Sequence, residues 1–149
     1  MTLFCDLDGV LADFNRGIED ITGHQPHDMP IRDMWRAAAD ADEFFYRLNW
    51  MSDGEALWNA IADQNPTVLT GIPMGGWASG QKKKWCGEQL GWHVPVITCW
   101  SKEKCLYGKS GDILIDDMLK AKAPWENMGG IFIHHTSTED TLRKLNKHL

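Results

Sequence analysis

The chain has 149 residues, which is long enough for one domain with a substantial core and at most a small inserted subdomain. Its apolar content of 43% and charged content of 24% are typical of soluble proteins, and its formal net charge of −6 argues against long nucleic acids as partners, because phosphate backbones favour basic surfaces. No apolar stretch is long enough to cross a membrane, and the four cysteines form no C-x-x-C pair, so we expect a reduced, cytoplasmic protein without a membrane partner.

The chain opens on an apolar run that is followed at once by two carboxylates. Residues 2–5 have the composition of a short strand covered on both faces, as in a parallel sheet, and Asp6, Asp8 and Gly9 follow where this strand ends. In open α/β sheets, ligands bind at this carboxyl edge. Two acids so close together repel each other unless a cation lies between them. The pair therefore predicts either a site for a hard divalent cation or a plain Asp-Gly turn.

The next fifty residues have the pattern of helices. The expected helical segments are residues 12–23, 31–39, 42–48 and 52–62, the last with Ser52 as its N-cap. These segments are more than one crossover between two strands needs. We therefore expect part of them to form a small helical cap over the carboxyl edge of the sheet.

From residue 66 the chain alternates between strands and helices. Strands are expected at residues 66–71, 94–99, 112–115 and 130–133, with helices at 81–90 and 137–147. This alternation predicts an α/β fold with a doubly wound, Rossmann-like parallel sheet of about five strands and the cap inserted after the first strand. We expect residues 1–14 and 65–149 to form the core and residues 15–64 the cap.

Polar side chains follow each of the expected central strands. Thr70 and Gly71 end the second strand, residues 101–104 (Ser-Lys-Glu-Lys) follow the third, and Asp116 and Asp117 end the fourth. Together with the first acid pair they supply carboxylates, a hydroxyl, backbone N–H groups and an ammonium group. Phosphoryl transfer needs this combination: a divalent ion, a nucleophile such as aspartate, and donors to the phosphate oxygens.

Four strings in this chain resemble the motifs of the haloacid-dehalogenase-like (HAD) phosphohydrolases. The first, residues 6–14 (Asp-Leu-Asp-Gly-Val-Leu-Ala-Asp-Phe), is most similar to the 5′(3′)-deoxyribonucleotidase branch. The second to fourth motifs are matched by residues 68–71, 101–104 and 113–117. The resemblance implies a HAD-type fold and an Mg²⁺-dependent phosphomonoesterase that forms an aspartyl-phosphate. Its implied substrate is a small phosphomonoester, in this branch a (deoxy)nucleoside monophosphate.

The resemblance also implies roles for the charged residues. Asp6 is similar to the nucleophile, which is also a metal ligand, and Asp8 to the general acid/base, whose backbone carbonyl binds Mg²⁺. Asp117 is implied to contact the metal with Asp116 in support, although which of the two touches it stays open. Lys104 is implied to offset the charge on the phosphoryl group.

Four further residues are implied to bind substrate. Thr70 and Gly71 would bind the phosphate, but the branch has a serine after the threonine, so one hydroxyl donor is missing from this chain. Phe14 matches an aromatic residue that surrounds the nucleoside, and Trp35 is expected to be a second. Aromatic residues at helical spacing are usually core, so the spacing alone favours a core role for both rings.

Other charged residues have weaker interpretations. Lys102 and Lys109 compete with Lys104 for the phosphate. The lysines at residues 82–84 are expected to be the exposed first turns of a helix, although one of them could reach a phosphate. The adjacent histidines 134–135 lack the ligand cluster of a zinc site, so we interpret them as structural.

Three other functions fit parts of the pattern. A response-regulator receiver is also doubly wound, but its phosphoryl acceptor would follow the third strand, where this chain has residues 101–104. A silent nucleotide-binding module would keep the pocket without the chemistry. A HAD-type phosphatase could also act on another small phosphoester or on a phosphorylated nucleic-acid end.

Overall fold

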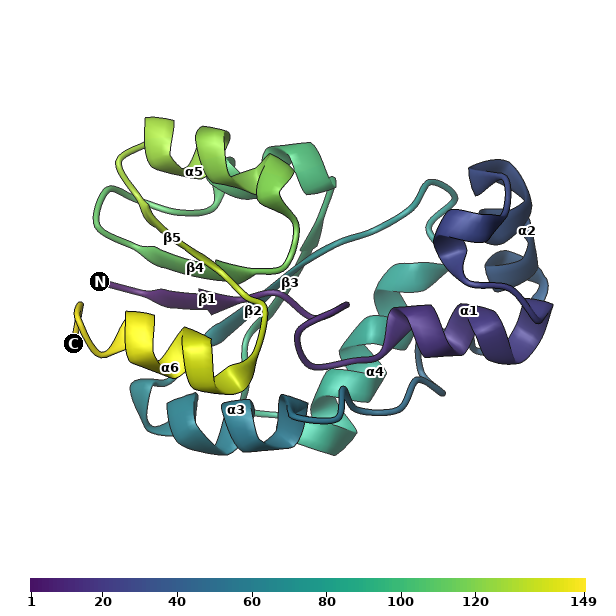
Figure 1. Ribbon diagram of the computed structural model, residues 1–149, viewed down its shortest axis with the longest axis horizontal. Helices are drawn as coiled ribbons and strands as arrows, with labels where there is room; N and C mark the ends of the chain where they lie inside the picture. The colour runs from purple at the N-terminus through teal and green to yellow at the C-terminus, as the bar shows by residue number, and fades with distance from the viewer.

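The core of the protein is a five-stranded parallel sheet, described over residues 1–149 by a computed structural model. The strands lie in the order β3-β2-β1-β4-β5 (Figure 1), which confirms the doubly wound prediction. In β1 at the centre, Cys5 lies beside Val68 of β2 on one side and Ile115 of β4 on the other. The strands are β1 (Leu3–Cys5), β2 (Thr67–Gly71), β3 (Val96–Cys99), β4 (Ile113–Asp116) and β5 (Ile131–His134).

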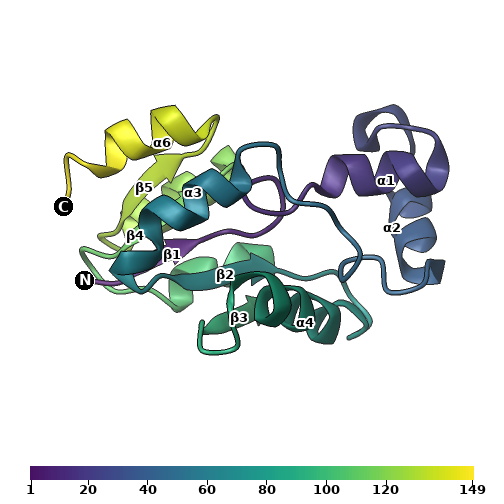
Figure 2. The same ribbon diagram turned by 90° about the horizontal axis from the view of Figure 1, so that it is seen from below.

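Helices cover both faces of the sheet (Figures 1 and 2). Alternate side chains of a strand point to opposite faces, so Cys5 packs with α3, α4 and α6, whereas Phe4 packs against Trp125 of α5 with the ring centroids 5.5 Å apart. The helices are α3 (Gly54–Ile61), α4 (Ala78–Leu90), α5 (Lys122–Asn127) and α6 (Thr138–Leu145). Short 3-10 helices are η2 (Ala62–Gln64), η3 (Ser101–Leu106) and η4 (Leu119–Ala121).

A pair of helices stands beside the carboxyl edge of the sheet and forms the cap (Figure 1). These are α1 (Phe14–Thr22) and α2 (Ile31–Asp40), joined through η1 (Pro26–Asp28). The Asp13 carboxylate caps α1 by accepting a hydrogen bond from the Arg16 backbone N–H, and Gly23 ends the helix in the left-handed conformation at φ 77°. The two helices pack against each other and hold Phe14 at the start of α1, facing the sheet edge.

Residues 42–48, where a helix was predicted, form turns instead. Glu43 adopts a φ of 50°, outside the helical region, and both Phe44 and Phe45 are buried. Packing of these rings therefore overrides the local helical tendency. Three hydrogen bonds join residues 45–50 to α4. They run from Phe45 N–H to Gln81 Oε1, from Tyr46 Oη to Glu88 Oε2, and from Trp50 Nε1 to Gln89 Oε1.

Helix α3, which the sequence analysis assigned to the cap, lies on the sheet beside α6. Leu57, Trp58 and Ile61 belong to the main hydrophobic cluster. The N-cap of α3 is Asp53 rather than Ser52, and the Asp53 carboxylate, instead of capping α3, accepts a hydrogen bond from the Thr138 backbone N–H of α6. The part that stands away from the sheet is thus shorter than residues 15–64.

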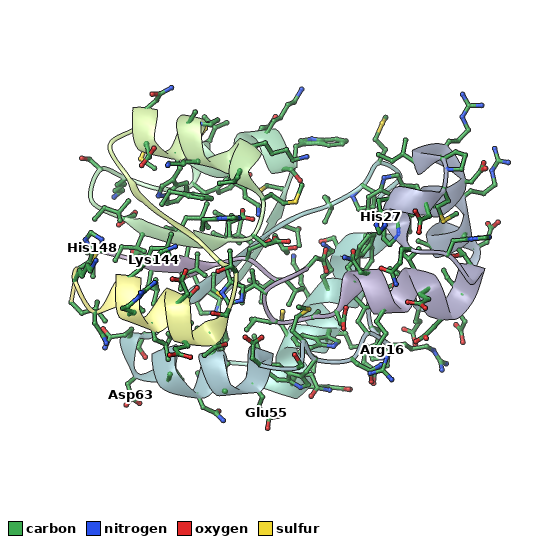
Figure 3. All side chains as sticks on the ribbon, viewed as in Figure 1. Arg16, His27, Glu55, Asp63, Lys144 and His148 are labelled. Carbon is green, nitrogen blue, oxygen red and sulfur yellow. The ribbon has the colours of Figure 1, made fainter.

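Exposed charged side chains of α3 and η2 lie on the outer surface of the protein. Figure 3 shows Glu55 and Asp63 pointing away from the core. No helix in the structure combines the length and apolar character that a membrane crossing requires.

Candidate active site

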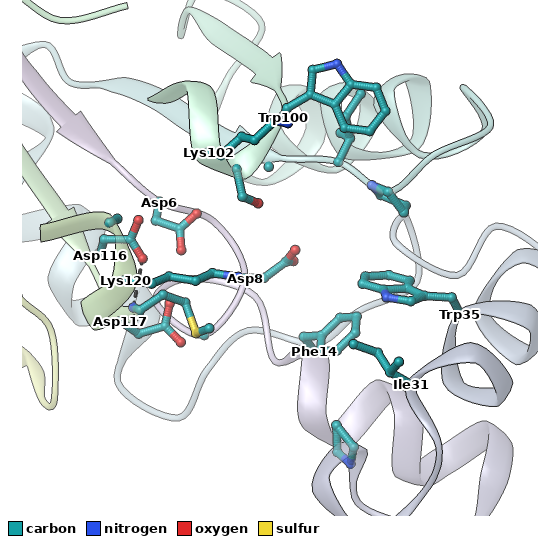
Figure 4. A pocket seen from close by; sticks show the side chains of 18 of the residues that line it. Asp6, Asp8, Phe14, Ile31, Trp35, Trp100, Lys102, Asp116, Asp117 and Lys120 are labelled. Carbon is teal, nitrogen blue, oxygen red and sulfur yellow. Dashed lines mark hydrogen bonds between the residues drawn. The ribbon is translucent and has the colours of Figure 1, made fainter. Parts of the chain in front are cut away.

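A cavity of about 1210 Å³ lies between the carboxyl edge of the sheet and the cap. The ends of β1 and β4 supply its acidic floor, including Asp6 and Asp117, and the cap supplies an apolar wall that includes Phe14 and Trp35 (Figure 4). It is thus lined by the residues predicted at the strand ends, except Thr70 and Glu103, and by both predicted aromatic residues. Ligands of parallel α/β sheets bind in this position.

The turn after β1 brings the first acid pair against the second. The Asp6 backbone N–H donates to the Ile115 carbonyl at 2.9 Å, which continues the sheet pairing by one residue. Gly9 has a φ of 81°, and a Cβ at this position would collide with the carboxylate of Asp117. Only glycine allows the loop to pass so close to that carboxylate.

Three carboxylates converge on one point. Asp6, Asp116 and Asp117 each offer an oxygen atom, and these atoms lie within 4.8 Å of one another. Burial and the charge of Asp6 raise the pKa of Asp116 to about 7 and that of Asp117 to about 8. The three carboxylates therefore repel one another, and a bound cation would reduce this repulsion.

Asp116, the last residue of β4, and Asp117, which follows it, differ in whether their carboxylate oxygens already have hydrogen-bond partners. Asp116 uses both: Oδ2 accepts from Lys104 at 2.8 Å and Oδ1 from the Met118 backbone N–H at 2.9 Å. Asp117 Oδ1 is buried and has no hydrogen-bond partner in the protein. Carboxylate oxygens in such a cluster are the donors that hard divalent cations such as Mg²⁺ prefer, so the residues fit this ion, with Asp117 offering the freer oxygen.

Lys104 is the lysine that the structure brings to the acids. It comes from η3, is buried, and donates through Nζ to Asp6 Oδ1 at 2.9 Å as well as to Asp116. Burial would lower the pKa of this ammonium group, but the two carboxylates outweigh burial and raise it. Burial would likewise raise the pKa of Asp6, yet Lys104 holds it below the ordinary value. Lys102 is exposed at the cavity rim, and Lys109 does not line the cavity.

A second buried lysine binds the other acid of the first motif. Lys82 on α4 is 1% exposed, and its Nζ donates to Asp8 Oδ2 at 2.7 Å, Thr70 Oγ1 at 2.9 Å and the Gly71 carbonyl at 2.6 Å. Burial raises the pKa of Asp8, and Lys82 offsets only part of that effect. The expectation that residues 82–84 are all exposed was wrong for Lys82.

Lys82 lies on the buried face of α4. The helix begins at Ala78, and the buried residues Ala78, Lys82, Trp85 and Cys86 then form one stripe at helical spacing. The spacing of Lys82 three residues before Trp85 and four before Cys86 was the signal in the sequence.

The predicted phosphate-binding pair at the end of β2 is split between two positions. Thr70 is 1% exposed and does not line the cavity, and its hydroxyl oxygen accepts from Lys82. Gly71 lines the cavity, and a Cβ there would collide with Oγ of Ser101. Ser101, which also lines the cavity, therefore places its hydroxyl where a side chain at position 71 would lie. Ser101 belongs to the predicted polar strand end at residues 101–104, but no phosphate-binding role was predicted for it.

The cap side of the cavity carries a row of aromatic rings. The rings of Phe14 and Trp35 lie 5.5 Å apart, Phe45 stacks on Phe14 at 6.1 Å, and Trp77 stacks on Phe45 at 5.4 Å between centroids. Phe14, Trp35 and Trp77 line the cavity. This wall offers flat apolar faces to any ligand whose phosphate reaches the acids.

His134, the last residue of β5, and His135, which follows it, do not line the cavity. His134 Nε2 lies 3.1 Å from the Asp117 carbonyl oxygen, and His135 Nδ1 lies 2.7 Å from the Thr141 hydroxyl. Burial lowers the pKa of His135. These contacts are those of residues that support the structure.

Comparison with models of protein families and with curated proteins found no match. Two solved structures are similar over nearly the whole chain. The first is a hydrolase from Streptococcus pneumoniae TIGR4, with a TM-score of 0.56, 14% identity, and coverage of 98% of this chain and 97% of the other. The second is a HAD-superfamily hydrolase from Ehrlichia chaffeensis, with a TM-score of 0.60, 10% identity, and coverage of 99% and 96%. The protein therefore has the α/β fold of HAD-superfamily hydrolases.

Proposed function

We propose that the protein is a HAD-type, Mg²⁺-dependent phosphomonoesterase that forms an aspartyl-phosphate on Asp6. The observation that carries this proposal is the floor of the cavity. There Asp6 is held by Lys104 in a cluster with Asp116 and Asp117, and Asp8 is held separately by Lys82. A nucleophile and a proton donor with different surroundings are what a two-step phosphatase needs.

The metal would be held by Asp6, Asp117 and the backbone carbonyl of Asp8, with Asp116 in support. The buried and unpartnered Oδ1 of Asp117 supports this assignment. When bound, Mg²⁺ supplies positive charge that offsets the charge of the carboxylates and the phosphoryl group.

The reaction divides into two displacements. The Asp6 carboxylate attacks phosphorus in line, the bond from phosphorus to the leaving oxygen breaks, and Asp8 gives its proton to that oxygen. Asp8 then takes a proton from water, whose oxygen attacks the aspartyl-phosphate. The bond between phosphorus and Asp6 breaks, inorganic phosphate leaves, and both residues return to their first state. The raised pKa of Asp8 supports its role as the acid.

Other residues would hold the phosphoryl group while this happens. Lys104 offsets charge at Asp6, and the Ser101 hydroxyl and the backbone beside Gly71 offer donors at the cavity wall. Thr70 lies beneath this wall, so we assign it to the support of Lys82 and Asp8 rather than to direct contact.

The proposed substrate is a (deoxy)nucleoside monophosphate. Phe14, Trp35 and Trp77 on the cap side can stack on a base while the phosphate reaches Asp6. A phosphorylated nucleic-acid end is the second candidate, because the exposed lysines 102 and 120 line the same cavity and could bind further phosphates.

Release of inorganic phosphate tests these proposals. The protein is assayed with para-nitrophenyl phosphate in Mg²⁺, with and without a chelator, and with a panel of 5′- and 3′-nucleotides, sugar phosphates and 5′-phosphorylated oligonucleotides. We expect metal-dependent release and a preference for nucleotides. No release from any compound would favour the silent binding module, and equal rates regardless of the base would remove the nucleotidase assignment but keep the chemistry.

A further inference from the structure

Lys82 is a buried cation whose three N–H donors are all used. They reach Asp8 Oδ2, Thr70 Oγ1 and the Gly71 carbonyl at 2.6–2.9 Å, and an ammonium group has only three donors. The side chain does not line the cavity. Lys82 therefore has neither the access nor a free donor to bind the substrate phosphate.

The burial of this charge is difficult to explain by packing alone. A buried ammonium group loses its hydration, and an apolar side chain of similar length would fill the same space without that loss. All three hydrogen bonds of its Nζ go to residues at the ends of β1 and β2, where the reacting groups lie. Its nearest aromatic neighbour is Phe45, whose ring centroid lies 4.4 Å from Nζ.

The two oxygens of Asp8 are in different situations. Oδ2 is bound by Lys82, whereas Oδ1 has no hydrogen-bond partner in the protein. Asp8 lines the cavity, and Figure 4 shows its carboxylate between Asp6 and Phe14. Lys82 thus anchors one oxygen of Asp8, and the other oxygen is buried without a partner in the protein.

We propose that Lys82 is a positioning residue that anchors Asp8 Oδ2 and so holds the Asp8 carboxylate in one orientation beside the oxygen of the leaving group. The inference rests on the proposed phosphatase function, in which Asp8 protonates that oxygen. Lys82 itself touches no reacting atom. It fixes the rotation of the Asp8 carboxylate, which would otherwise turn freely and lose much of its efficiency as an acid.

The test compares two substrates that differ by one group. Phenyl phosphate and para-nitrophenyl phosphate have nearly the same size, but phenolate is the poorer leaving group and depends more on a proton from Asp8. In Lys82→Met we expect kcat for phenyl phosphate to fall at least about 10-fold more than kcat for para-nitrophenyl phosphate. KM for both should stay close to that of the wild type, because no phosphate contact is removed.

The ratio of the two kcat values does not depend on how much of the variant is folded, because both substrates report on the same active molecules. Lys83→Met is the matched control, since Lys83 is the exposed neighbour of Lys82, and it should leave the ratio unchanged. Lys82→Arg keeps a cation beside Asp8 and should recover part of the ratio. A ratio for Lys82→Arg no higher than for Lys82→Met would count against positioning by charge.

The possible failures are distinguishable. If the wild type hydrolyses both compounds and Lys82→Met loses activity equally on both, or on neither, the positioning role is wrong and the proposed function stands. If the wild type hydrolyses neither compound with Mg²⁺, the proposed function is wrong and this inference falls with it.

Discussion

The two sides of the cavity are built in different ways. On the core side, charged groups are buried and joined by short ionic contacts, such as Lys104 to Asp6 at 2.9 Å and Lys82 to Asp8 at 2.7 Å. On the cap side, aromatic rings of Phe14 and Trp35 meet at 5.5 Å between centroids, with no charge at the contact. Ionic contacts hold atoms at defined positions, whereas ring contacts tolerate small displacements. We infer that the core side performs the chemistry and the cap side selects the substrate.

The largest effect is expected on the core side. Asp6→Asn removes the nucleophile and a metal ligand but keeps the volume, so we expect kcat to fall on the order of 10³-fold or more with the fold intact. Turnover is measured with para-nitrophenyl phosphate and the fold by circular dichroism. Asp63→Asn, at an exposed position outside the cavity, is the control. Full activity in Asp6→Asn would refute the nucleophile assignment.

Acidity should weaken metal binding at the same cluster. Burial and the charge of Asp6 raise the pKa of Asp117 to about 8, so at pH 6 this carboxyl holds a proton that a cation must displace. The apparent affinity for Mg²⁺ should therefore rise about 10-fold or more from pH 6 to pH 8. Titration calorimetry in two buffers of different ionisation enthalpy measures both the affinity and the protons released.

A matched variant sharpens this measurement. Asp117→Asn removes one of the titrating ligands, so its weaker Mg²⁺ binding should depend less on pH than that of the wild type. Equal wild-type affinity at pH 6 and pH 8, with no proton release, would contradict the role of these carboxylates.

Changes on the cap side should separate binding from chemistry. Trp35→Ala removes one face of the aromatic wall, so KM for a nucleotide should rise about 10-fold, whereas kcat for para-nitrophenyl phosphate should stay within about twofold of the wild type. Steady-state kinetics with both substrates provide the test. Trp92→Ala, at an exposed position away from the cavity, is the control. A loss of kcat on both substrates would show that the two sides are not independent.

The smallest effect is expected at Ser101. Ser101→Ala removes one neutral hydroxyl donor, so KM for any phosphomonoester should rise about three- to tenfold, in line with a single hydrogen bond. Ser110→Ala, whose hydroxyl binds the Gly129 carbonyl instead, is the control. An unchanged KM for both variants would remove Ser101 from the phosphate site.

The core side of the site was predictable because its signals are local. Asp6 and Asp117 each follow an apolar run, and parallel strands bring such ends to one edge whatever the details of the loops. Lys82 was missed because a lysine is seldom fully buried, although its spacing from Trp85 and Cys86 places it on the buried face of α4. Ser101 was placed at a strand end, but its role could not be predicted because its hydroxyl meets Gly71 only through the pairing of β2 with β3, in which Gly71 lies beside Cys99.

The cap was less predictable for the same reason. The turns at residues 42–47 form because Phe44 and Phe45 are buried against other elements. Local helical propensity depends only on neighbouring residues in the sequence, so it could not predict these tertiary contacts. The position of α3 on the sheet likewise depends on its contact with α6. The fold class followed from the alternation of strands and helices, and the division into core and cap needed tertiary contacts.

Residues 42–48, which follow the cap helices, are attached to α4, and this attachment affects how the site responds to large ligands. Phe45 binds Gln81, and Lys82 is the next residue of the same helix. A bulky ligand that pushes the cap outward therefore pulls on the first turns of the helix that carries the ammonium group under Asp8. An oversized substrate would therefore bind more weakly, and its leaving group would also receive a proton more slowly.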